Sequence, residues 1–83
     1  MTRHDSSLQT QNVISTAQNA VEDVQNATAQ AQSHPSEETR ENAQNAVVQA
    51  ERAIAQAQDA ENQAAVDQAE EALNQEKSVL QDL

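Results

Sequence analysis

The sequence predicts an all-α protein, a small antiparallel three-helix bundle with alanine-rich packing like that of a coiled coil. Its 83 residues include 16 Ala, 14 Gln and 9 Glu, which all favour helix, and no Gly. Apolar residues recur at the spacing i, i+3, i+4, i+7, which is typical of a helix with one buried face. Residues 1–83 are therefore expected to form a single small helical domain.

A first helix is expected over residues 7–33, after a mobile segment at residues 1–6. Ser6 is a suitable N-cap, because Gln9 follows it at the spacing of a capping box. Pro35 disfavours helical backbone at the residue before it, so the first helix should end near residue 33.

A second helix is expected over residues 37–58. Ser36 is a good N-cap, since its hydroxyl can accept a hydrogen bond from a free backbone amide of the first turn. Glu37 and Glu38 follow it and place two negative charges at the positive end of the helix dipole. This start is the best-defined boundary in the sequence.

A repeated pattern supports both helices. The pentapeptide Ala-Gln-Asn-Ala-Val occurs at residues 17–21 and again at residues 43–47, an offset of 26. The alignment keeps the apolar spacing in phase over about four helical turns and so predicts one buried stripe on each helix. The matched stripes are Ala17, Ala20, Val21, Val24, Ala27, Thr28 and Ala31 with Ala43, Ala46, Val47, Ala50, Ala53, Ile54 and Ala57.

The third helix is expected over residues 62–82. Its stripe repeats the second one at an offset of 19 residues, which on an unbroken helix would aim it about 100° away. Asp59 and Asn62 can cap a new helix, and a turn there would direct both stripes into one core. Because this segment contains no Gly or Pro, a hairpin with one long second helix is the alternative.

The predicted core is small, because most stripe positions are alanine and bury little area. At about 25 cal/mol per Å² such stripes stabilise a short chain only modestly. A dimer that shares one core, or a chain that folds only on a partner, is therefore an open alternative. Val48 lies off the stripe of the second helix, where a partner could cover it. Glu76 falls in the seam of the third helix and predicts that the bundle opens there.

The composition excludes most catalytic and cofactor-binding functions. The chain has no Cys, Phe, Tyr or Trp, and its two histidines, His4 and His34, do not share a helix face. Without glycine it cannot form a phosphate-binding glycine loop. Neighbouring Glu70 and Glu71 point in different directions on a helix and do not form an acid–base pair. The sequence predicts no enzyme, no cofactor and no metal site.

The net charge of −10 is concentrated in the last third of the chain, where seven acids accompany Lys77 alone. Such a charge is repelled by nucleic-acid phosphates and by anionic membranes, so neither is an expected partner. No segment approaches the ~20 apolar residues of a membrane span, and the N-terminal residues lack the apolar run of a signal peptide. A cytoplasmic protein is expected.

We expect a non-enzymatic protein that binds a protein partner, as an adaptor or an inhibitor, through its third helix. A second hypothesis is an inhibitor, phage-derived, whose carboxylates imitate nucleic acid and occupy a nucleic-acid-binding protein. A third is a structural or self-associating protein, such as a homodimer. The expected contact surface combines acidic and apolar side chains of the third helix: Asp67, Glu70, Glu71, Val79, Leu80 and Leu83.

Overall fold

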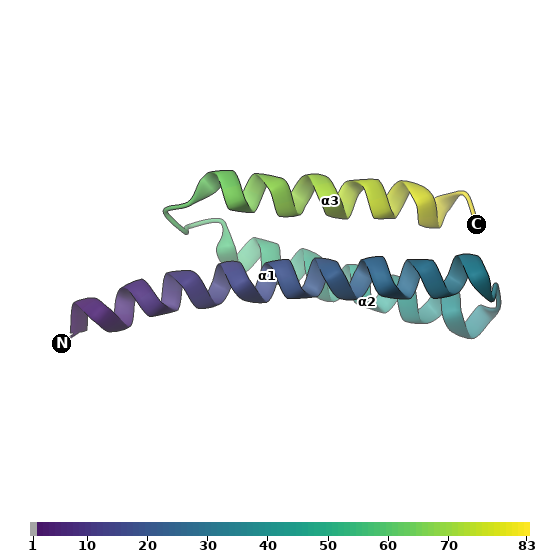
Figure 1. Cartoon of the computed structure of the whole chain (residues 1–83), viewed down its shortest axis with the longest axis horizontal. Helices are drawn as coiled ribbons and strands as arrows, with labels where there is room; N and C mark the ends of the chain where they lie inside the picture. Colours follow the sequence, from purple (N-terminus) through teal and green to yellow (C-terminus); the bar gives the residue numbers. More distant parts are fainter. Residues whose placement is uncertain (1) are drawn as a thin grey trace.

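A computed structural model of the chain describes the backbone of residues 2–83 and the side chains of residues 13–83. Over these residues the regular structure is entirely helical, with α1 at Thr2–Ser33, α2 at Glu37–Ala57 and α3 at Gln63–Gln81. The three helices pack against one another (Figure 1). The all-α three-helix bundle that the sequence predicts is therefore confirmed.

The helices run up, down and up, so that α2 is antiparallel to both α1 and α3 (Figure 1). The bundle measures 49 × 19 × 15 Å, and its long dimension is the length of α1, which at 1.5 Å per residue is about 48 Å. The N-terminal part of α1 extends past the connection between α2 and α3 (Figure 1). This end of α1 therefore has no helix beside it.

α1 begins at Thr2 and not near residue 7, so Ser6 lies inside the helix instead of capping it. The physical reason is that residues 2–6 contain neither Gly nor Pro, so no strong helix breaker interrupts the helix in this segment. The mobility expected of residues 1–6 stays a prediction, and Met1 lies outside the described residues.

The connection between α1 and α2 is fixed by a capping box. The backbone N–H of Thr39 donates to Ser36 Oγ at 3.1 Å, and the backbone N–H of Ser36 donates to Thr39 Oγ1 at 3.0 Å. The Thr39 hydroxyl also lies 2.9 Å from the carbonyl oxygen of His34, to which it donates. Ser36 is thus confirmed as the N-cap, and Thr39 satisfies a second free amide at the same helix end.

A separate turn joins α2 to α3, so the alternative of one long second helix is wrong. Asn62 caps α3, its Oδ1 accepting from the backbone N–H of Ala65 at 3.2 Å. Gln63 Nε2 donates to the carbonyl oxygens of Gln58 and Ala60, both at 2.6 Å. These carbonyls directly follow the end of α2, where the sequence has no glycine to cap the helix. The Gln63 side chain satisfies them as hydrogen-bond acceptors instead.

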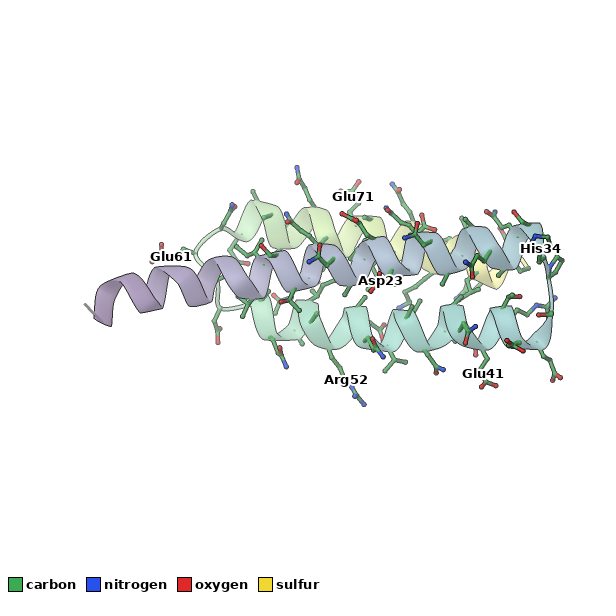
Figure 2. The ribbon with its side chains drawn as sticks, turned by 60° about the horizontal axis from the view of Figure 1, so that its bottom comes forward. Asp23, His34, Glu41, Arg52, Glu61 and Glu71 are labelled. Atoms are coloured by element: carbon green, nitrogen blue, oxygen red, sulfur yellow. The ribbon has the colours of Figure 1, made fainter. Side chains whose placement is uncertain are left out.

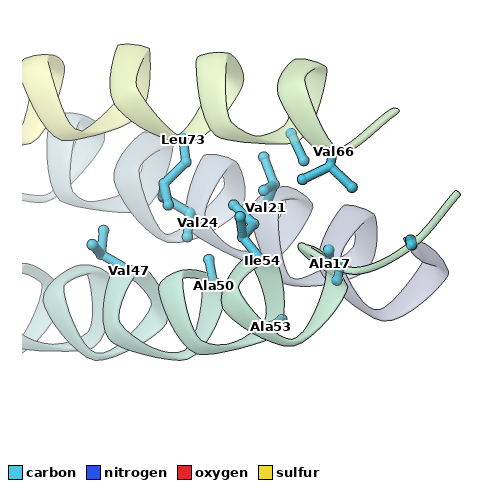
Figure 3. Packing of buried hydrophobic residues seen from close by; sticks show 12 residues of the cluster. Ala17, Val21, Val24, Val47, Ala50, Ala53, Ile54, Val66 and Leu73 are labelled. Carbon is cyan, nitrogen blue, oxygen red and sulfur yellow. The ribbon is translucent and has the colours of Figure 1, made fainter. Parts of the chain in front are cut away.

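The core is built from the predicted stripes (Figure 3). Alanine is frequent on the facing sides of α1 and α2, which lets the two helix backbones approach closely, whereas α3 contributes larger aliphatic side chains. The buried positions are Ala17, Val21, Val24, Thr28 and Ala31 of α1, Ala43, Val47, Ala50, Ala53, Ile54 and Ala57 of α2, and Val66, Ala69 and Leu73 of α3.

The core thins toward the C-terminal end of α3, as expected from Glu76. The side chains of Glu76, Val79 and Leu80 are half-buried, and Leu83 is exposed. The carboxylate of Glu76 therefore keeps contact with water and avoids the full cost of burying a charge.

Thr28 is the one buried polar residue among the described side chains. It is 1% exposed, and its hydroxyl has no hydrogen-bond partner there. When the two stripes are aligned at the offset of 26 residues, Thr28 corresponds to the fully apolar Ile54. A buried hydroxyl without a partner costs about 1–3 kcal/mol, so Thr28 is a weak point in the core.

Replacing Thr28 with valine should stabilise the bundle, because valine keeps the shape of threonine and removes the unsatisfied hydroxyl. We expect a gain of about 1 kcal/mol in the free energy of unfolding. Urea unfolding followed by circular dichroism at 222 nm measures it. The same substitution at Thr39 is the matched control, and it should lower stability by about 1 kcal/mol because it removes half of the capping box. Equal effects at both threonines would contradict this account.

Candidate functional site

The three acidic residues predicted to act together differ in exposure. Asp67 and Glu71 are exposed, and Figure 2 shows Glu71 on the outer side of α3. Glu70 is half-buried and faces α2, where it lines a hollow together with Leu73. The spacing i, i+3, i+4 puts the three within about 100° of one another, with Glu70 at the edge of that face nearest α2. Only Glu70 lies beside the apolar side chains of the bundle.

The three predicted apolar residues also differ in exposure and in the side of α3 on which they lie. Leu80 is half-buried, packs against the core and lines a hollow on the side of α2. Val79 is half-buried and lies about 100° round the helix from Leu80. Leu83 is 36% exposed, and its carbonyl oxygen accepts from Arg40 Nη2 of α2 at 3.0 Å. Of the six predicted contact residues, the structure brings Glu70 and Leu80 to one surface.

That surface is a groove between α2 and α3, made of two hollows that meet at Glu51. One hollow has a volume of about 280 Å³ and the other about 330 Å³. We call them together the α2–α3 groove. Its lining residues are Gln44, Val47, Val48, Glu51, Ile54, Ala55 and Gln58 of α2, and Glu70, Leu73, Asn74, Lys77, Leu80 and Gln81 of α3.

The groove is apolar at its base and polar at its edges. Ile54 and Leu73 are buried beneath the first hollow, and Val47 and the half-buried Leu80 lie beneath the second. Val48 stands at the edge of the second hollow with 45% of its surface exposed. Exposed Val48 and half-buried Leu80 line the same hollow and together form an apolar surface that a partner can cover.

The lining residues form three layers along the groove. Ile54 and Leu73 make the first layer and Val47 and Leu80 the third. Between them Lys77 Nζ lies 2.9 Å from Glu51 Oε2. On α2 the three layers are formed by residues 47, 51 and 54, and on α3 by residues 80, 77 and 73. Successive layers are thus three or four residues apart, which is about one helical turn.

The ion pair of Lys77 and Glu51 joins the two helices across the groove. Both side chains keep contact with solvent, with 39% and 48% of their surface exposed. An ion pair at such a position contributes about 0–1 kcal/mol, because water screens it and two long side chains must be held in place. It therefore holds the groove together weakly.

The seam between α2 and α3 stays open because of the residues that face it. Toward α1, α2 presents alanines, which allow close approach. Toward α3 it presents longer side chains such as Glu51 and Gln58. On the opposite side of the groove, α3 contributes Glu70, Asn74 and Lys77. These polar groups are more stable in water than enclosed between helices, so this seam does not close as a dry interface.

The sequence alone does not identify the α2 side of this groove. Val48 is set apart in the sequence because it lies off the buried stripe, and its exposure confirms that position. Glu51 is not predicted, although it occupies a position next to the stripe between Val47 and Ile54. A charge there, matched by the lone lysine of the third helix, is the signal that could have found it.

Other kinds of site have little support among the described residues. No group of three His, Asp or Glu side chains there lies close enough together to hold a metal ion. None of the described helices combines the length and apolar character required to cross a bilayer. A hollow of about 420 Å³ beside His34 is also lined by Ala29, Gln30, Ser33 and Thr39, and the Thr39 hydroxyl is already used in the capping box. The side chain of His4 lies outside the described residues.

Comparison with family models, with curated proteins and with solved structures finds no match to this chain.

The coupling between Lys77 and Glu51 should be small. We expect a double-mutant cycle of Lys77→Gln and Glu51→Gln, measured by urea unfolding, to give less than about 1 kcal/mol. Raising the salt concentration should reduce it further, because both groups are reached by counter-ions. A coupling several times larger would show that the ion pair is a main support of α3 and not a weak link across the groove.

Proposed function

We propose that this chain is a non-enzymatic protein-binding module that accepts an amphipathic helix of a partner protein in the α2–α3 groove. The observation that carries the proposal is the apolar surface of the groove, where exposed Val48 and half-buried Leu80 lie next to the buried side chains of Val47, Ile54 and Leu73. Binding of an apolar helix face in a groove between two helices is a recurrent mode of peptide recognition.

The dimensions of the groove suit a helix. From residue 44 to residue 58 it follows α2 for about 21 Å, the length of nearly four helical turns. A helix placed there would become the fourth member of the bundle and pack on α2 and α3 at once. Such an occupant would cover the side chains that three helices leave partly exposed.

The charge of the chain favours a positively charged partner. A net charge of −10 on 83 residues attracts cationic segments over several ångströms and accelerates their encounter. Two copies of this chain carry the same charge and repel each other. The proposed module therefore acts as an adaptor or inhibitor of a different protein, and self-association, including a dimer with a shared core, stays a prediction.

Imitation of nucleic acid also stays a prediction. Its surface would be the outer side of α3, where Asp67 and Glu71 are exposed. Glu70 would contribute less to it than expected, because it faces the groove. The two hypotheses therefore use different sides of α3, and an experiment that locates the bound partner separates them.

Nuclear magnetic resonance titration of the isotope-labelled chain with a synthetic cationic amphipathic helix of about 18 residues tests the proposal. We expect shift changes at Val47, Val48, Ile54 and Leu80, because the peptide would cover Val48 and Leu80 and lie directly above the buried Val47 and Ile54. Val48→Gln should weaken binding by about fivefold, since it removes an apolar contact worth about 1 kcal/mol.

Leu83→Gln is the matched control, because Leu83 is the other exposed large aliphatic residue among the described side chains and does not line the groove. It should leave the affinity for the peptide unchanged. Shift changes confined to Asp67, Glu71 and their neighbours would support mimicry instead. The absence of binding by cationic, neutral and anionic helices alike would refute the proposed function.

A further inference from the structure

The Lys77–Glu51 ion pair in the middle layer of the groove restricts the kind of helix that can bind there. Glu51 belongs to both hollows, and its carboxylate is paired with Lys77 from the opposite helix. Apolar layers lie on either side of this pair. A helix lying along the groove must therefore cross an ion pair between two apolar contacts, and it must satisfy or displace the charges that it covers.

We infer that the groove is built for a cationic helix with two apolar anchors seven residues apart and a basic residue between them, which replaces Lys77 as the partner of Glu51. This inference rests on the proposed function and specifies the chemistry of the partner. The two anchors would contact the layer of Ile54 and Leu73 and the layer of Val47 and Leu80.

The spacing follows from the groove itself. Val47 and Ile54 are seven residues apart on α2, and Leu73 and Leu80 are seven residues apart on α3. Seven residues of helix span about 10.5 Å, so side chains at i and i+7 of an aligned helix reach both layers. A residue at i+3 or i+4 of that helix then lies opposite Glu51.

The charges in the groove favour an added cation. Glu51 and Glu70 both line the first hollow, whereas Lys77 is the one cationic side chain among the residues that line the groove. Glu70 has no basic partner within ion-pair distance among the described residues. A basic residue from the occupant would balance the second carboxylate, whereas an acidic or neutral occupant would leave a carboxylate desolvated without compensation.

Lys77 can leave the pair at low cost. Its side chain is 39% exposed, so its ammonium group can turn into water on its flexible stem while another cation takes its place. Covering Glu51 strengthens its attraction to the cation of the occupant and also removes part of its water, so the two effects oppose each other and the net gain in affinity is small. In the free protein Lys77 thus competes with the basic residue of the partner.

The test measures the affinity of a fluorescently labelled helical peptide that has leucine at positions i and i+7 and lysine at i+4. Lys77→Gln should tighten binding by about two- to fivefold, because it removes the internal competitor. Arg52→Gln is the matched control, since it changes the net charge equally and Figure 2 shows Arg52 pointing away from the other helices. It should alter the affinity by less than half as much.

A second pair of variants tests Glu51 directly. Glu51→Gln should weaken binding by about two- to fivefold relative to Glu41→Gln, whose carboxylate points away from the bundle (Figure 2). A peptide with its central lysine moved to the outer face, at unchanged total charge, should lose both effects. Circular dichroism of each variant verifies that the helices are intact.

The possible results are distinct. Equal effects of the two cation variants, or of the two carboxylate variants, would overturn the exchange at Glu51 while leaving groove binding in place. Weaker binding to Lys77→Gln would also overturn it, because Lys77 would then support the occupant. No binding of either peptide, while another helix binds the groove in the titration above, would overturn this inference alone; no binding of any helix would refute the proposed function as well.

Discussion

Close packing between the alanine-rich faces of α1 and α2 is the constraint on which the rest of the structure depends. Small side chains such as Ala50 and Ala57 let the two backbones approach, and dispersion attraction summed over many neighbouring atoms replaces the large buried areas of an ordinary core. The 26-residue repeat supplies these positions in register on both helices. α3 can then lie across the pair, where Val66 and Leu73 fill the remaining space (Figure 3).

Closing one seam in this way leaves another open. On α2 the side toward α1 carries short alanines, and the side toward α3 carries longer residues. On α2 these longer residues include Val47, Glu51 and Ile54. The α2–α3 groove therefore lies on the side of α2 where longer residues stand in place of alanines.

The features that are predictable from the sequence are those set by local chemistry. Ser36 as an N-cap, the break before Asn62 and the buried stripes all follow from the order of residues along one helix. The partner of Ser36 in the capping box is not predictable in this way, because Glu and Gln are the usual residues where Thr39 stands. The groove cannot be predicted from one helix, since it depends on which side of α3 faces α2. The half-burial of Glu70 at the α2 side of α3 cannot be predicted for the same reason.

The net charge gives a physical reason why an apolar groove can remain open in a free protein. Exposed apolar surface favours association with any available partner, and the nearest one is a second copy of the same chain. A charge of −10 on each copy opposes that encounter, while it attracts a helix of opposite charge. The Lys77–Glu51 pair also limits which helices bind, because it keeps the centre of the groove charged and hydrated when no cationic occupant is present. In the proposed module the negative charge therefore favours the approach of cationic helices, and the apolar surface of the groove stabilises the bound helix.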